Sequence, residues 1–95
     1  MEHHEPLERR EVYYLGRVQG VGFRYTARSI VRLYPVTGYV KNLPDGRVEL
    51  VVEGRAEEVS ALLQAIRAEL GRHIRDVQET TRAATGQFKS FDVKF

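Results

Sequence analysis

Residues 16–24 have the sequence GRVQGVGFR, which contains three glycines and ends on an arginine. Glycine reaches positive φ at little cost, so the N–H groups of successive residues can converge on one point. A helix that begins directly after such a run adds unpaired N–H donors and a partial positive charge. The guanidinium of Arg24 is a planar donor fork that fits two oxygens of a phosphate. The run therefore predicts a loop that binds phosphate.

A purely structural role for the same run is the alternative at this point. Glycine-rich turns also occur where a helix packs closely on a sheet, and an arginine in a first helical turn is usually solvated. The run is not a P-loop, because no Gly-Lys-Ser or Gly-Lys-Thr follows it. Gly16, Gly20 and Gly22 also lack the Gly-x-Gly-x-x-Gly spacing of dinucleotide-binding folds. A nucleotide site is therefore disfavoured.

Composition limits the class of protein further. With 95 residues, of which 42% are hydrophobic, the chain has the size of one domain with one modest core. The formal net charge is +2 and the 15 lysines and arginines are scattered, so no nucleic-acid surface is indicated. The absence of cysteine excludes disulfides, a thiol nucleophile and a thiolate metal site. No membrane-length apolar run or signal peptide is present, so we expect a cytoplasmic protein with no membrane partner.

The first eight residues are expected to form a flexible tail, and residues 9–95 the folded domain. The tail contains His3 and His4, which would point in different directions in either regular structure because they are neighbours. No carboxylate pattern accompanies them, so we expect two solvated side chains and no metal site.

Alternation of apolar and polar residues predicts strands at residues 11–18, 47–53 and 88–95, and a further strand is expected at residues 36–42. Residues 74–83 are expected to form another strand, although they alternate poorly and are mostly polar. Helical spacing of apolar residues predicts one helix from residue 23 to Pro35 and another from residue 55 to Gly71, which acts as the stop. The order β-α-β-β-α-β, with a short extra terminal strand, predicts a ferredoxin-like α/β sandwich of the α+β class. In this fold two helices cover one face of an antiparallel sheet.

This topology brings two distant segments together. Right-handed crossover places the third strand between the first and the second, so the ends of the first two strands lie at one edge, about 9 to 10 Å apart. The glycine-rich loop and Asn42 would meet there, although by residue type alone the favoured role of Asn42 is a strand-end residue that caps the turn, since Asn is common in turns. If the turn at Thr85 and Gly86 returns the last strand to this edge, the Phe95 carboxylate would approach Arg24.

Two runs of residues resemble the signatures of one family. Residues 16–24 resemble the first signature of the acylphosphatase family. The run GYVKN at residues 38–42, with Gly46, Val48 and Gly54 at matching intervals, resembles the second. Two signatures at the right separation are more specific than one, and the resemblance extends from the first strand to the C-terminus. Residues 9–95 are therefore expected to be an acylphosphatase-like domain.

The resemblance implies a metal-independent hydrolase without a cofactor, which splits acyl phosphates into a carboxylate and inorganic phosphate. It implies that Arg24 and Asn42 are catalytic and that the loop binds the phosphoryl group. Such a reaction needs no strong general acid, because the conjugate acid of the leaving carboxylate has a pKa of about 4 to 5. Asn42 would orient the attacking water, and the substrate phosphate would take its proton. The expected phosphate ligands are Arg24 and the backbone N–H groups of Val18, Gln19, Gly20, Val21, Gly22 and Phe23.

The alternative function is a non-catalytic ferredoxin-like module that binds an anion or small ligand. An RNA-binding member of this fold would carry aromatic residues in RNP-type motifs on its central strands, and the chain has none. A regulatory domain would normally accompany a catalytic one, whereas this chain stands alone. We therefore expect a monomer whose partners are an acyl phosphate substrate and inorganic phosphate.

Overall fold

The computed structural model describes residues 7–95. The expectations for His3, His4 and most of the tail therefore lie outside the described residues. In chain order the elements are β1 (Leu7–Gly16), α1 (Phe23–Val31), β2 (Thr37–Asn42), β3 (Val48–Arg55), α2 (Ala56–Leu70), a short 3₁₀ helix η1 (Gly71–His73), β4 (Ile74–Ala83) and β5 (Phe91–Lys94).

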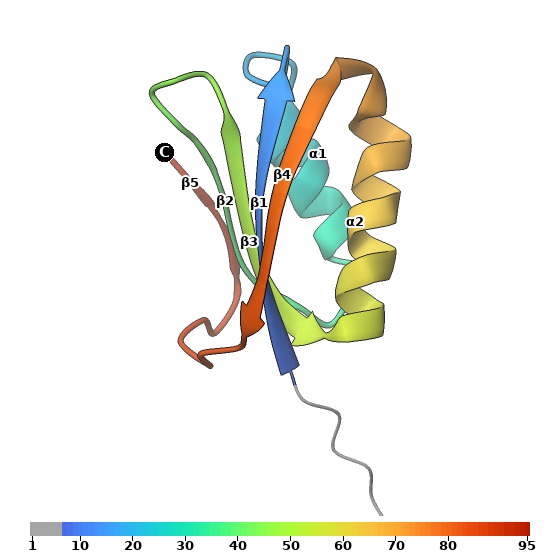
Figure 1. Ribbon diagram of the computed structural model, residues 1–95, viewed down its shortest axis with the longest axis vertical. Coiled ribbons are helices and arrows are strands. Elements are labelled where there is room, and N and C mark those ends of the chain that lie inside the picture. The colour runs from blue at the N-terminus through green and yellow to red at the C-terminus, as the bar shows by residue number, and fades with distance from the viewer. Residues whose placement is uncertain (1–6) are drawn as a thin grey trace, which may run out of the picture.

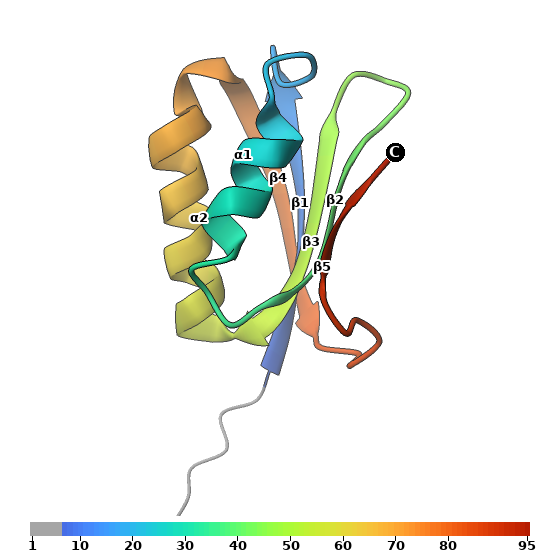
Figure 2. The same ribbon diagram turned by 180° about the vertical axis from the view of Figure 1, so that it is seen from behind.

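The five strands form one sheet in the order β4-β1-β3-β2-β5, and both helices cover the same face of it (Figures 1 and 2). Strand β3 lies between β1 and β2 and is antiparallel to both. The ferredoxin-like α+β fold and the central position of the third strand are thereby confirmed. One departure is that the terminal strand β5 joins the edge of β2 in parallel, whereas a wholly antiparallel sheet was expected.

The core lies between the sheet and the two helices. Alternate residues of β1 and β3 point toward the helices, and each helix turns a stripe at three- and four-residue spacing toward the sheet. No helix in residues 7–95 is long and apolar enough to cross a membrane. The buried residues of this core are Val12, Tyr14, Val18, Phe23, Ala27, Val31, Val40, Val48, Leu50, Val52, Val59, Leu62, Ile66 and Leu70.

Several element boundaries differ from the sequence-based expectation; among them, α1 ends at Val31, before Pro35, and β5 begins at Phe91 instead of residue 88. Strand β1 begins at Leu7, because residues 7–10 pair with β3 and residues 8–10 also pair with β4, although their side chains are mostly polar. It ends at Gly16, where a Cβ atom would lie 2.5 Å from the carbonyl oxygen of His73. The second helix ends at Leu70 with Gly71 as its C-cap, as predicted, although the φ of Gly71 is −57° and the chain continues as η1.

Candidate active site

The loop between β1 and α1 carries the predicted anion ligands. Gly20 and Gly22 have φ of +79° and +75°, in the left-handed region that favours glycine. Gly22 is the N-cap of α1 and no side chain caps this helix, whose first backbone bond runs from the N–H of Thr26 to the carbonyl of Gly22 (3.0 Å). None of the N–H groups of residues 18–23 donates a hydrogen bond to another residue of the described chain. These donors are therefore available at the positive end of α1.

A side chain from within the loop fixes it to the β2–β3 hairpin. The amide nitrogen of Gln19 donates to the carbonyl oxygens of Leu43 and Arg47, at 2.8 and 2.9 Å. Val18 is fully buried in the core, so the loop is held at both of these adjacent residues. This anchoring brings the loop beside the end of β2, where Asn42 lies.

The loop, Arg24 and Asn42 surround one pocket of about 230 Å³. Gln19 and Val21 do not line it, although both were among the expected phosphate ligands. Tyr25, which is half exposed, lines it and was not expected to. The signal for Tyr25 was its place beside Arg24 in the first turn of α1. The residues lining the pocket are Val18, Gly20, Gly22, Phe23, Arg24, Tyr25 and Asn42.

Asn42 contributes an oxygen without a partner. Its Cα is paired in register with that of Val48, at the end of β2 next to the hairpin. The side-chain oxygen Oδ1 is buried and accepts no hydrogen bond from the described residues. A buried acceptor left unsatisfied costs about 1 to 3 kcal/mol. Such a group inside a pocket is an available acceptor for a ligand's hydrogen.

The C-terminal strand holds Arg24. Its Nη1 donates to the carbonyl oxygen of Lys94 at 2.9 Å, and its guanidinium lies over the ring of Phe95, with Cζ 4.6 Å from the ring centroid. These contacts form because β5 runs parallel to β2 and so reaches the same edge of the sheet. The last strand thus returns to the edge where Arg24 lies, as expected from the turn at Thr85 and Gly86. The recorded contacts, however, are a main-chain carbonyl and an aromatic ring, and no ion pair with the C-terminal carboxylate is among the described contacts.

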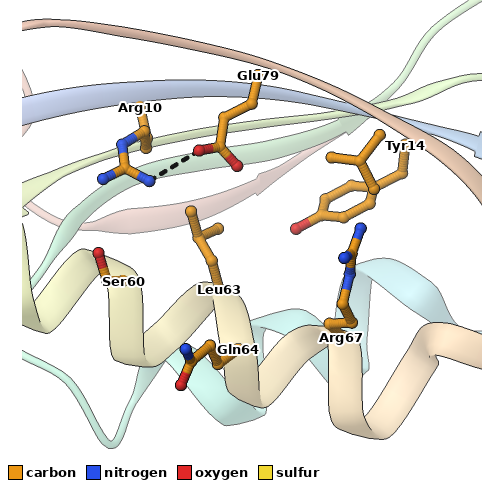
Figure 3. Close-up of a pocket in the computed structure, with 8 residues that line it drawn as sticks. Arg10, Tyr14, Ser60, Leu63, Gln64, Arg67 and Glu79 are labelled. Atoms are coloured by element: carbon orange, nitrogen blue, oxygen red, sulfur yellow. Dashed lines mark hydrogen bonds and ion pairs between the residues drawn. The ribbon is translucent and has the colours of Figure 1, made fainter.

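A second hollow, of about 270 Å³, lies between α2 and the edge strand β4 (Figure 3). Arg10 pairs with Glu79 at 2.8 Å across this hollow, and Arg67 extends from α2 toward Tyr14. Burial raises the pKa of Tyr14, so its hydroxyl stays protonated at neutral pH. In residues 7–95, no three His, Asp or Glu side chains come together as a metal site would require.

Comparison with known proteins gives one consistent result. The family model described as Acylphosphatase matches residues 10–93. The chain is 45% identical over 89 residues to the acylphosphatase of Methylococcus capsulatus, covering 92% of this chain and 96% of that protein. It is 39% identical over 87 residues to the acylphosphatase of Archaeoglobus fulgidus, covering 90% and 96%. The crystal structure of acylphosphatase from Bacillus subtilis has a TM-score of 0.80 at 29% identity, covering 94% of this chain and 99% of that one.

Proposed function

Because the chain belongs to the acylphosphatase family, we propose that it hydrolyses acyl phosphates to a carboxylate and inorganic phosphate in the pocket at the end of β1 and β2. The observation that carries this proposal is that one pocket contains both hydrogen-bond donors and a hydrogen-bond acceptor without partners in residues 7–95. Unpaired N–H donors come from the loop before α1, and Asn42, whose buried Oδ1 has no partner among the described residues, lines the same pocket from β2.

The loop and Arg24 bind the phosphoryl group in this proposal. Phosphoryl transfer depends chiefly on positioning and on stabilising the charge of the equatorial oxygens, which backbone N–H groups and a guanidinium both do. Gly20 and Gly22 turn the backbone so that its donors converge, and their positive φ explains why glycine stands at both positions. Arg24 has one donor engaged by Lys94, so its orientation is set while its remaining donors stay available.

Asn42 positions the attacking water. Its Oδ1 accepts a hydrogen of the water and directs the water's lone pair at phosphorus. No carboxylate or histidine lines the pocket as a general base, so the phosphoryl oxygens accept the proton of the water. The leaving carboxylate departs in line with the water, on the opposite side of phosphorus, and needs no protonation because it is a weak base. The reaction so described uses neither a metal ion nor a cofactor.

The test begins with phosphate release from acetyl phosphate and benzoyl phosphate in the presence of EDTA. The enzyme is expected to hydrolyse both and to leave p-nitrophenyl phosphate, a monoester, essentially intact. A non-catalytic anion-binding module would bind phosphate and release none.

Two variants then separate the roles of the residues. Arg24→Ala should lower kcat by about 100- to 1000-fold and weaken inhibition by phosphate, since it removes a charged ligand. Asn42→Ala should lower kcat as much but leave phosphate inhibition nearly unchanged. Arg28→Ala, one helical turn beyond Arg24 and exposed, is the matched control and should keep full activity. Equal loss of phosphate inhibition in the Arg24 and Asn42 variants would contradict this division.

A further inference from the structure

Four basic residues line a hollow beside the proposed phosphate pocket. Arg17 follows the end of β1, and Arg72, His73 and Arg75 come from η1 and the start of β4; we call these four the arginine patch. No aspartate or glutamate lines this hollow. None of the three arginines forms an ion pair with a carboxylate of residues 7–95.

The patch is built from side chains that lie next to one another. The Nε of Arg72 donates to Nε2 of His73 at 3.3 Å, which places the guanidinium against the imidazole. Arg75 also borders an adjoining hollow that contains Asp45, but this carboxylate pairs with Arg47 at 2.8 Å. The positive charge of the patch is therefore not neutralised by its described neighbours, and it favours an anion at this surface.

The patch begins where the phosphate pocket ends. Gly16 and Arg17 line the patch, and Val18, the next residue, lines the phosphate pocket. Residues two positions apart are separated by at most about 7 Å, so the two sites are within reach of one small molecule. Both lie at the same end of the sheet, where β1 ends and β4 begins (Figure 1).

The geometry of in-line displacement also places the leaving acyl group on the side of the arginine patch. Asn42 ends β2, and the strand order β4-β1-β3-β2 places β4 on the far side of β1 from it. A water held by Asn42 attacks from the β2 side, and an in-line displacement sends the leaving carboxylate to the other side. The hollow between the end of β1 and the start of β4 lies on that other side.

We propose that the arginine patch binds a second anionic group on the acyl part of the substrate. The enzyme would then prefer acyl phosphates whose acyl chain carries a carboxylate or phosphate at its far end. Arginine suits both groups, because its donor fork fits either oxyanion. This inference rests on the proposed function, since it uses the direction in which the acyl group leaves.

The experiment compares substrates that differ only at the far end of a rigid ring. Benzoyl phosphate, 4-carboxybenzoyl phosphate and 4-phosphonobenzoyl phosphate cannot fold back on themselves, so any preference comes from the protein. The wild type should have a KM about fivefold lower for the two charged substrates than for benzoyl phosphate, as expected for exposed charge pairs. A preference for only one of them identifies whether carboxylate or phosphate is the group bound.

The test variant is the double substitution Arg72→Gln and Arg75→Gln. It should abolish the preference and change the KM for benzoyl phosphate less than twofold. The matched control is the double substitution Arg32→Gln and Arg55→Gln, which removes the same charge from two exposed positions outside both hollows and should keep the preference. Circular dichroism checks that both variants are folded. An equal loss of preference in the two double variants, or no preference in the wild type, would overturn the proposal.

Binding of stable analogues tests the patch without turnover. Titration calorimetry with benzylphosphonate and 4-carboxybenzylphosphonate should show about fivefold tighter binding of the charged analogue to the wild type and equal binding to the Arg72 and Arg75 double variant. If the analogues behave in this way but no acyl phosphate is hydrolysed, the patch stands and the proposed function fails. If hydrolysis is normal and the two analogues bind equally, the function stands and the patch fails.

Discussion

Two buried polar groups at opposite ends of the β2–β3 pair differ in whether they have partners. Glu53, opposite Thr37 in register, has a carboxylate that accepts from the N–H of Gly86 (2.9 Å) and from the N–H and hydroxyl of Thr85 (2.9 and 2.8 Å). Arg9 adds an ion pair at 3.5 Å. At the other end, Oδ1 of Asn42 has no partner among the described residues.

The contrast separates a structural site from the proposed binding site. A saturated buried carboxylate fixes the segments that donate to it, and here it fixes the start of the connection that carries the chain from β4 across to β5. An unsaturated buried amide lowers stability and leaves an acceptor for a ligand. Because β5 in turn contacts Arg24 through Lys94, the saturated end supports the position of a residue at the unsaturated end.

The largest expected effect is a loss of activity without a loss of stability. Asn42→Ala should lower kcat by about 100- to 1000-fold. Its free energy of unfolding should stay within about 0.5 kcal/mol of the wild type or rise slightly, because the variant removes an unsatisfied acceptor. Urea unfolding together with the acetyl phosphate assay measures both. A stability loss as large as that of a Glu53 variant would indicate that Asn42 stabilises the fold, as Glu53 does.

The reverse pattern is expected at the other end. Glu53→Gln should lower the free energy of unfolding by about 2 kcal/mol, because an amide offers fewer acceptor sites to the same donors and loses the charge. With most molecules still folded at 25 °C, kcat should change less than threefold. Glu69→Gln, an exposed acidic position on α2, is the control and should change stability by no more than about 0.5 kcal/mol. A large drop in kcat with unchanged stability would contradict the assignment.

A matched pair of glycines sharpens the comparison. Gly22 in the proposed active site and Gly86 beside Glu53 have φ of +75° and +73°, and no atom lies within 4 Å of a Cβ added to either. Alanine at each position should therefore cost about the same, on the order of 1 kcal/mol, from backbone strain alone. Only Gly22→Ala should also lower kcat, by about tenfold, because it turns the N–H donors of the loop. Equal kcat values for the two variants would argue against a role for the loop backbone.

The smallest effect concerns pH. Burial alone would raise the pKa of Glu53, but the hydrogen bonds from Thr85 and Gly86 and the charge of Arg9 outweigh it, and its pKa lies below the usual value. A carboxylate with a lowered folded-state pKa stabilises the fold above its unfolded pKa of about 4.3 and loses that contribution as the pH falls through the folded value. The stability difference between wild type and Glu53→Gln should therefore be constant from pH 7 to pH 5 and shrink below it. Urea unfolding from pH 7 down to about pH 3 tests this, and a difference that grows on acidification would contradict it.

Local pattern was sufficient for most of the fold. The apolar stripe of α2 and the glycine-rich turn before α1 are local features, and both elements were predicted close to their observed bounds. The start of β1 was missed because Glu8, Arg9 and Arg10 have polar side chains, and their place in the strand comes from main-chain pairing with β3 and β4. Gly71 was predicted as the stop of α2 and is its C-cap, but the 3₁₀ helix η1 that follows was not predicted, because the sequence does not show that Gly71 keeps a helical φ of −57°.

The candidate site likewise contains residues that could be predicted from the sequence and contacts that could not. Arg24, Asn42 and the glycines were predicted because their residue types and spacing are characteristic. The Lys94 carbonyl was not, because every residue has a carbonyl and sequence does not say which one will meet a guanidinium. The arginine patch could not be predicted from the sequence either, because Arg17 lies far along the chain from Arg72 and Arg75. Scattered charges become one surface only when β1 and β4 pair.

By itself, the sequence determined the order of the elements and the chemical groups at the loop and at Asn42, because periodicity and residue type act over a few neighbouring positions. Only the tertiary structure decided which distant groups meet: the side chain of Gln19 with the β2–β3 hairpin, Arg24 with β5, and Glu53 with Thr85 and Gly86. Such contacts depend on strand order and register, which are set by packing of the whole sheet against its two helices.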